Sequence, residues 1–203
     1  MNAGAENGMS AHTAEISALV SVEVARQLAP LRADLQREIA ELRERTPEDR
    51  ASLVVFSGDL DKVLAAFVIA TGAAAAGLET SMFFTFWGLS AVKSQTAKPV
   101  RKDLKQRMFT LLTPASSEQL GTSRLNFFGM GSRMLRSMMK ERGIASLEEL
   151  MDMARELGVR MTACTMSMDA MGVTRDELLD GIDFGGVASF MSVAARSRVS
   201  LFI

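Results

Sequence analysis

The N-terminal part of the chain carries a helical pattern of apolar residues. From Ile16 to Leu42 they recur at spacings of 4, 4, 4, 3, 4, 4 and 3 residues, which fits a helix and excludes a strand. The mean spacing is longer than that of a strict heptad coil. We expect Pro30 to kink this helix or to start a second segment. The apolar stripe must pack on a domain, on a sister chain or on lipid; the slightly acidic polar face favours protein.

These patterns divide the chain into three parts. Residues 1–12 are small and polar, and we expect them to be disordered. Residues 13–50 form the amphipathic helix and a linker, which ends with a Thr-Pro-Glu-Asp stretch. Residues 51–203 form the folded domain, because hydrophobic runs and turn signals alternate there to the end of the chain.

The domain begins with a strand–helix–strand unit. Ser52–Ser57 is a short continuous apolar run, which is typical of a strand buried on both faces. Leu60–Ala76 reads as a helix that Gly77 ends. Thr80–Trp87 is rich in β-forming residues and predicts the second strand. The two strands should be parallel, with a right-handed crossover.

The same alternation continues towards the C-terminus. Ser146 and Glu149 form a capping-box sequence at the start of a helix over Leu147–Leu157. The fold class predicted is α/β: a doubly wound, mostly parallel sheet flanked by helices, with an N-terminal amphipathic helical extension. The other elements expected are helices at Leu104–Leu112, Gly131–Glu141, Met166–Met171, Arg175–Asp180 and Gly185–Arg196, strands at Val159–Cys164 and Val199–Ile203, and a loop at Pro114–Gly121.

Composition narrows the function. The chain has 203 residues and a net charge of -1, so a general nucleic-acid binder is not expected. One Cys and one His, His12, make a disulfide framework or a Cys- or His-based metal site hard to build. Neither GxGxxG nor a P-loop motif is present, and we expect no cofactor and no metal. The absence of a signal peptide and the single Cys favour the cytoplasm.

Cys164 is the main candidate for chemistry. It stands at the carboxyl end of a predicted buried strand, the edge at which open parallel sheets bind ligands. A helix start directly after it would favour the nucleophilic thiolate. The alternative is that Cys164 is a small buried apolar residue, as free cysteines often are.

Other candidates lie at the same predicted edge. Gly58 would let a ligand approach the backbone, and Asp59 would bind substrate or simply cap the next helix. Trp87 would line a pocket, or belong to the core or an interface. The basic stretch Lys93–Arg107 would attract an anionic donor, or be a solvated loop. Ten of the fifteen methionines lie between Met130 and Met171, and we expect them to pack helices or contact subunits.

Three separate blocks resemble one known family. The segments VVFSGDLDKVLAAFVIATGAAAAGLETSMFFTFWGL, LGVRMTACTMSMDAMGV and ELLDGIDFGGVASFM…LFI are similar to the DsrE/DsrF-like sulfur-carrier family, in the branch often labelled peroxiredoxin-like. The resemblance covers roughly Ser52 to Ile203 and implies a flanked α/β sheet. It also implies that Cys164 matches the family's cysteine, which accepts sulfane sulfur as a persulfide or binds a thiosulfonate. Relatives tend to form homo- or hetero-oligomers.

The function expected is therefore that of a sulfur carrier or sulfurtransferase. Its partners would be small anionic sulfur compounds, sulfur-donor and sulfur-acceptor proteins, and copies of itself. The hydroxyls of Thr165 and Ser167 would help to hold the anionic adduct. A single cysteine suits a carrier better than a self-sufficient enzyme, and the role requires a sulfur that reagents can reach. The alternatives are a non-catalytic oligomeric interaction module and a peripheral membrane scaffold for sulfur enzymes.

Overall fold

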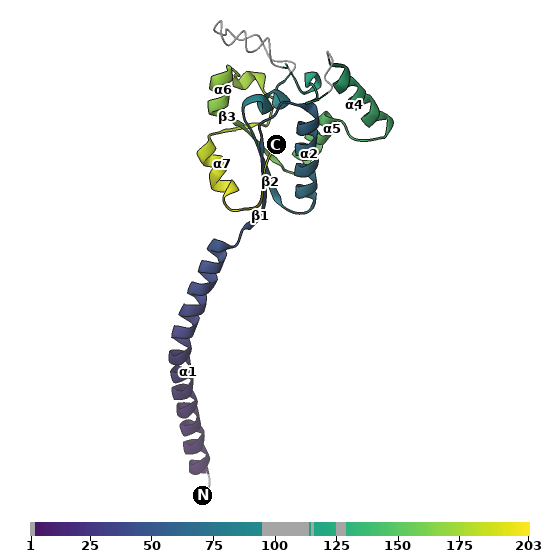
Figure 1. The fold of residues 1–203 in the computed structure, drawn as a ribbon. Helices are drawn as coiled ribbons and strands as arrows, with labels where there is room; N and C mark the ends of the chain where they lie inside the picture. The colour runs from purple at the N-terminus through teal and green to yellow at the C-terminus, as the bar shows by residue number, and fades with distance from the viewer. Residues whose placement is uncertain (1–2, 95–113, 115, 125–128) are drawn as a thin grey trace. The chain divides into compact units, whose positions relative to one another are not determined.

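The computed structural model describes residues 3–94, 114, 116–124 and 129–203 (Figure 1). The chain forms two compact units, Met1–Pro47 and Glu48–Ile203. The helix expected at Leu104–Leu112 lies outside the described residues.

The first unit is a single helix, α1 (Ala3–Arg45). The helix is continuous through Pro30, so of the two alternatives expected for this proline the start of a second segment is not seen. Proline removes one helical hydrogen bond there, and the Ala- and Leu-rich turns on either side maintain the helix.

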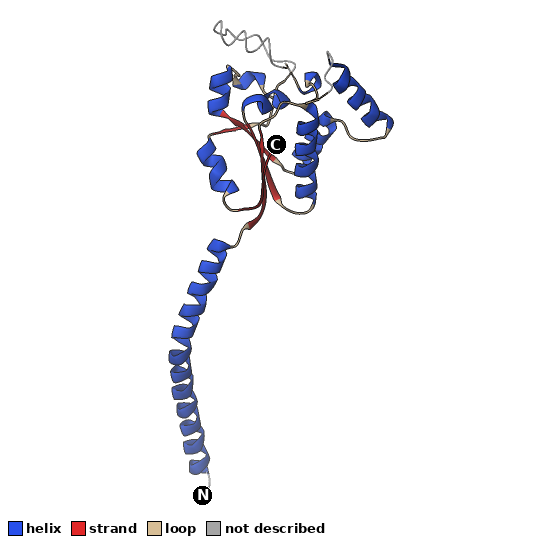
Figure 2. Ribbon diagram, viewed as in Figure 1, coloured by secondary structure: helices blue, strands red, loops and turns tan. Residues whose placement is uncertain are grey.

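The second unit is built on one five-stranded sheet in the order β4-β3-β2-β1-β5 (Figures 1 and 2). Every pair of neighbouring strands is parallel, which confirms the predicted doubly wound α/β class. The strands are β1 (Glu48–Val55), β2 (Glu79–Phe84), β3 (Arg160–Cys164), β4 (Asp183–Gly185) and β5 (Ser197–Phe202).

Helices cover both faces of this sheet. Figure 1 shows α2 (Leu60–Ala75) and α5 (Leu147–Glu156) on one side, with α6 (Thr165–Met171) and α7 (Val187–Ala194) on the other. This layering follows from right-handed crossovers between parallel strands. The core lies between the sheet and α2, where the rings of Phe67 and Phe84 are 6.0 Å apart and both side chains are fully buried.

Local sequence signals set several helix ends. Ser146 and Glu149 form the predicted capping box at the start of α5. Gly77 follows α2 with a φ of 88°, the left-handed conformation for which glycine is suited. The remaining elements are the 3₁₀-helices η1 (Phe86–Val92), η2 (Ser117–Gln119) and η4 (Arg175–Glu177), and the helix α4 (Met130–Glu141).

Two elements near the carboxyl edge of the sheet differ from the sequence prediction. β2 ends at Phe84 and the chain turns into η1, so Trp87 lies in a 3₁₀-helix and not at a strand end. The turn is made at Phe86, whose φ is 47°, a conformation that hydrophobic pattern does not reveal. Asp183–Gly185 pairs with β3 as a short strand where a helix was expected to begin. The loop expected at Pro114–Gly121 contains η2.

Candidate functional site

The predicted site residues come together at the carboxyl edge of the sheet. All neighbouring strands are parallel, so the residues that follow β1, β2 and β3 emerge at the same edge. Gly58 and Asp59 follow β1, Trp87 follows β2, and Cys164 ends β3. The edge is therefore the place to look for binding or chemistry.

Cys164 lies where the sequence predicted, but it is completely buried. It is the last residue of β3 and immediately precedes α6, and it pairs in register with Gly185 of β4. Its exposed fraction is 0%. The thiol thus has the expected position on the sheet, while any reagent must first gain access to it.

Hydroxyl groups surround this strand end. The Oγ1 of Thr85 and the Oγ of Ser167 lie 2.7 Å apart and form a buried hydrogen bond between the end of β2 and α6. Thr165 Oγ1 donates a longer hydrogen bond, 3.5 Å, to the carbonyl oxygen of Gly185. Both hydroxyls that were expected to hold an adduct therefore already have protein partners.

Thr85 was not singled out by the sequence analysis. The feature that could have revealed Thr85 is its hydroxyl group, which stands inside the apolar run of β2 and the residues after it. A buried hydroxyl needs a partner, so this position predicts a hydrogen bond across the sheet edge. Sequence alone does not identify Ser167 as that partner.

Asp59 precedes α2 but does not cap it through its side chain. Its Oδ2 accepts hydrogen bonds from Ser57 Oγ at 2.9 Å and from Lys62 Nζ at 2.7 Å, while Ser57 Oγ accepts one from the Asp59 backbone N–H. The hydrogen bond that Lys62 donates to Asp59, together with the negative charge of Asp59, raises the pKa of Lys62 above its ordinary value of 10.5. The cluster is a charged, partly exposed group at the edge of the sheet.

Two glycines allow the segments after β1 and β2 to cross closely. A Cβ atom at Gly58 would lie 2.7 Å from the carbonyl oxygen of Trp87. A Cβ atom at Gly88 would collide with the carbonyl oxygen of Val55. On the side where a Cβ would stand, Gly58 is thus in contact with the backbone of Trp87 and not with open space.

A cavity of about 440 Å³ opens beside this crossing. The predicted residues Gly58, Asp59 and Trp87 all line it, together with Phe56, Ser57, Lys62, Ser90, Pro114 and Gly121. Cys164 is not among its lining residues. The structure therefore separates the predicted site into an open pocket after β1 and β2 and a buried thiol after β3.

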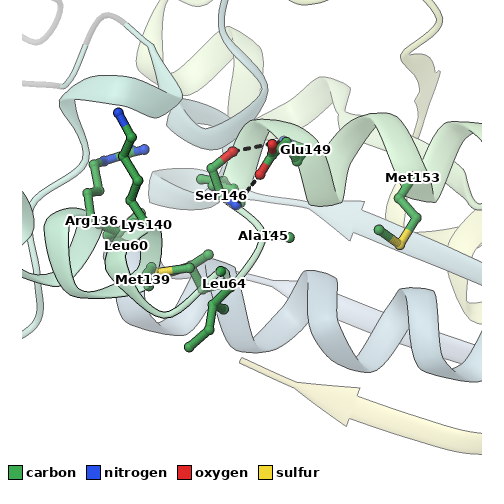
Figure 3. A pocket seen from close by; sticks show the side chains of 12 residues that line it. Leu60, Leu64, Arg136, Met139, Lys140, Ala145, Ser146, Glu149 and Met153 are labelled. Atoms are coloured by element: carbon green, nitrogen blue, oxygen red, sulfur yellow. Dashed lines mark hydrogen bonds between the residues drawn. The ribbon is translucent and has the colours of Figure 1, made fainter.

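A larger cavity of about 750 Å³ lies elsewhere, against α2, α4 and the start of α5 (Figure 3). Leu60, Leu64 and Met139 make its apolar wall, and Arg136 and Lys140 also line it. Figure 3 shows the Ser146–Glu149 hydrogen bonds at its side. None of the predicted site residues lines this cavity.

Aromatic side chains gather near the open pocket. The ring of Phe56 is 5.7 Å from the rings of both Phe86 and Phe202. These three side chains and Trp87 are exposed, Phe202 by 71%. We call Phe56, Phe86, Trp87 and Phe202 the edge aromatic group; exposed aromatic groups of this kind often mark interaction surfaces.

The basic stretch is only partly described. Lys93 is buried, with an exposed fraction of 6%, and forms an isolated bridge with Leu178, so it is not part of a solvated loop. The part from residue 95 to Arg107 lies outside the described residues.

The described part of the chain has neither a cluster of metal-ligating side chains nor a membrane-spanning helix. No group of three or more His, Cys, Asp or Glu side chains is placed to hold a metal ion there. None of the described helices combines the length and apolar character that crossing a membrane requires.

The fold and the strand-end cysteine define a class of parallel α/β proteins with one buried thiol at the carboxyl edge of the sheet. The sequence matches the model of the DsrE/DsrF/DrsH-like family over residues 47–202, and the chain belongs to this family. This establishes the family that the three sequence blocks suggested.

Individual relatives cover the same domain. The uncharacterized protein YrkE of Bacillus subtilis is 44% identical over 154 residues, which are 76% of this chain and 96% of that protein. The sulfur carrier protein DsrE2 of Allochromatium vinosum is 31% identical over 160 residues, 77% of this chain and 99% of that protein. The crystal structure of the YchN protein from E. coli aligns with a TM-score of 0.43 at 10% identity, covering 76% of this chain and 99% of that one.

Proposed function

We propose that this protein is a sulfur carrier in which Cys164 accepts sulfane sulfur and passes it to a partner thiol. Membership of the DsrE/DsrF/DrsH-like family and similarity to a protein named as a sulfur carrier support a sulfur-relay role. The observation that carries the proposal is the position of Cys164, the chain's one cysteine, at the carboxyl end of β3.

The chemistry is two displacements at sulfur. The Cys164 thiolate attacks the outer sulfur of a donor persulfide, R–S–SH; the new S–S bond gives Cys164–S–SH and the donor leaves as R–S⁻. A thiolate on an acceptor protein then attacks the outer sulfur and releases the Cys164 thiolate. With tetrathionate, the same attack gives a thiosulfonate-type adduct and releases thiosulfate. No net oxidation occurs in the transfer between thiols.

The burial of Cys164 adds a requirement to this proposal. Since its exposed fraction is 0%, transfer takes place from an opened conformation in which Sγ is accessible. Separation of the hydrogen bond between Thr85 and Ser167, a residue of the helix that begins directly after Cys164, is a step that would loosen this region. The hydroxyls of Ser167 and Thr165 then become available to the anionic adduct.

The open pocket and the edge aromatic group complete the proposed site. Gly58, Asp59 and Trp87 line the pocket together with Lys62, whose ammonium is paired with the Asp59 carboxylate. The exposed rings suit contact with a donor or acceptor protein. As part of the same proposal, the protein acts in the cytoplasm and forms homo-oligomers.

Intact-mass spectrometry after incubation with polysulfide or tetrathionate tests the proposal. We expect the full chain to gain mass that a reducing agent removes, and Cys164→Ala to gain none. A Cys164 that stays unmodified under conditions that label a small exposed thiol would overturn the carrier function. A mass gain that persists in Cys164→Ala would place the chemistry at another atom and overturn the proposed site.

The burial of Cys164 favours a second candidate, a non-catalytic interaction module. In that function the edge aromatic group contacts partners and the thiol is only a packed core residue. The two functions differ in the mass experiment, because an interaction module has no need for sulfur on Cys164.

A further inference from the structure

Within the first unit, α1 carries a continuous apolar stripe that no other described element of that unit covers. Seven large apolar side chains along the helix have exposed fractions between 43% and 61%. An amphipathic helix normally buries such a stripe against another element. The members of the stripe are Val20, Val24, Leu28, Leu31, Leu35, Ile39 and Leu42.

The stripe repeats every eleven residues. Val20, Leu31 and Leu42 are separated by eleven positions, as are Val24 and Leu35, and Leu28 and Ile39. Eleven residues span three helical turns at about 3.67 residues per turn, so the stripe stays on one face with only a slight right-handed drift. A stripe of this length on one face is typical of two helices that pack along each other. A helix that packs on a small domain at one end needs apolar residues only at that end.

The charges beside the stripe indicate how a second helix would pair with it. Arg32 directly follows Leu31 and therefore lies on one flank, whereas Asp34 and Glu38 directly precede stripe residues and lie on the other. In a parallel pair of identical helices, opposite flanks meet, which brings basic and acidic residues together. In an antiparallel pair, like flanks meet and like charges repel.

The helix is also separate from the family domain. The family match begins at residue 47, and relatives that are covered almost completely match only about three quarters of this chain. The first unit, Met1–Pro47, therefore lies almost entirely outside the family domain.

We propose that α1 binds α1 of a second copy of this chain, as a parallel, in-register coiled coil whose seam is the stripe from Val20 to Leu42. The eleven-residue repeat makes the supercoil right-handed or nearly straight. The arrangement does not depend on the chemistry of Cys164.

Cysteine cross-linking in the full chain tests the pairing. In the Cys164→Ala background, Val20→Cys and Leu42→Cys place single thiols about 33 Å apart along the helix. An in-register parallel pair brings each thiol against its own copy, so each variant alone should form a disulfide-linked dimer under mild oxidation. An antiparallel pair would cross-link only when the two variants are mixed, and that result would overturn the proposal.

Two controls separate a specific seam from random collision. Ala33→Cys lies on the opposite face of α1 and should cross-link far more slowly than the stripe variants. Adding Leu35→Asp to Val20→Cys should lower the cross-linked fraction severalfold, whereas adding Ala33→Asp should leave it unchanged. Equal cross-linking at Ala33 and at the stripe, or none at either stripe position, would overturn the proposal. Since all variants lack Cys164, failure here is distinct from failure of sulfur transfer.

Discussion

The hydroxyl oxygens of Thr85 and Ser167 lie 2.7 Å apart, buried between the end of β2 and the helix that follows Cys164. Ser167 is 0% exposed. In such a site each hydroxyl depends on the other, because water is not available to replace a lost partner. This pair therefore joins the end of β2 to α6, the helix that begins directly after Cys164.

The losses of stability caused by removing the Thr85 and Ser167 hydroxyls should not be additive. We expect Ser167→Ala or Thr85→Val to lower the free energy of unfolding by about 1–3 kcal/mol, because each leaves a buried unpaired hydroxyl. The double variant should lose less than the sum of the two single losses. Urea unfolding of the four proteins measures this coupling, and strictly additive losses would show that the hydrogen bond has no energetic effect.

The same pair should control access to Cys164. If opening at this joint exposes the thiol, Ser167→Ala should increase the rate at which a small thiol reagent modifies Cys164 in the native protein. Thr122→Ala, which removes a hydroxyl with a partner in an exposed loop, is a suitable control and should not change the rate. Equal rates in wild type and Ser167→Ala would mean that access to the thiol has another route.

The crossing after β1 and β2 gives a second test of the fold. Gly88→Ala places a Cβ atom against the backbone carbonyl of Val55, which cannot move without distorting β1, so we expect a loss of several kcal/mol or failure to fold. Gly72→Ala is the matched control, because nothing lies within 4 Å of its Cβ position. Gly72 lies in α2, and alanine there should stabilise the protein by about 0.5–1 kcal/mol. Thermal unfolding distinguishes the two substitutions, and equal effects would contradict the observed crossing.

The strand pattern and the position of Cys164 were predictable because local sequence decides them. A continuous apolar run followed by a helix start specifies a buried parallel strand. β3 follows this prediction closely, whereas β1 overlaps the predicted Ser52–Ser57 but begins at Glu48 and ends at Val55. The capping box at Ser146 is equally local. These features need no knowledge of residues far away in the chain.

The burial of Cys164 and the end of β2 depend on contacts that sequence pattern does not contain. The turn at Phe86 needs a positive φ in a bulky residue, which the crossing with the segment after β1 maintains. The sequence also does not reveal the hydrogen-bond partners of Asp59. Its side chain was expected to bind substrate or to cap the next helix, whereas its carboxylate accepts hydrogen bonds from Ser57 and Lys62. Whether a strand-end residue is sealed or open depends on side chains from several elements at once.

Acid stability should report on the capping box of α5. The backbone N–H of Ser146 donates a 2.7 Å hydrogen bond to Glu149, and this bond, followed by the hydrogen bond with the Ser146 side chain, lowers the pKa of Glu149 below its ordinary value of 4.5. The unfolded chain therefore takes up this proton at a higher pH than the folded chain. The contribution of Glu149 to stability is complete above the ordinary value and is lost as pH falls through the lowered pKa.

Glu149→Gln isolates this contribution, because glutamine keeps an acceptor for the Ser146 N–H but has no titrating group. We expect its urea midpoint to fall less steeply than that of wild type between about pH 5 and pH 3. Some acid sensitivity should remain, because the pKa of Asp61 is also lowered: desolvation raises it, but the hydrogen bonds from Ser123, a backbone hydrogen bond and the charge of Lys62 together lower it. Ser146→Ala is the companion variant and should lose about 1 kcal/mol at neutral pH through its missing cap. A pH slope in Glu149→Gln as steep as that of wild type would show that the carboxylate is not held by the capping box in solution.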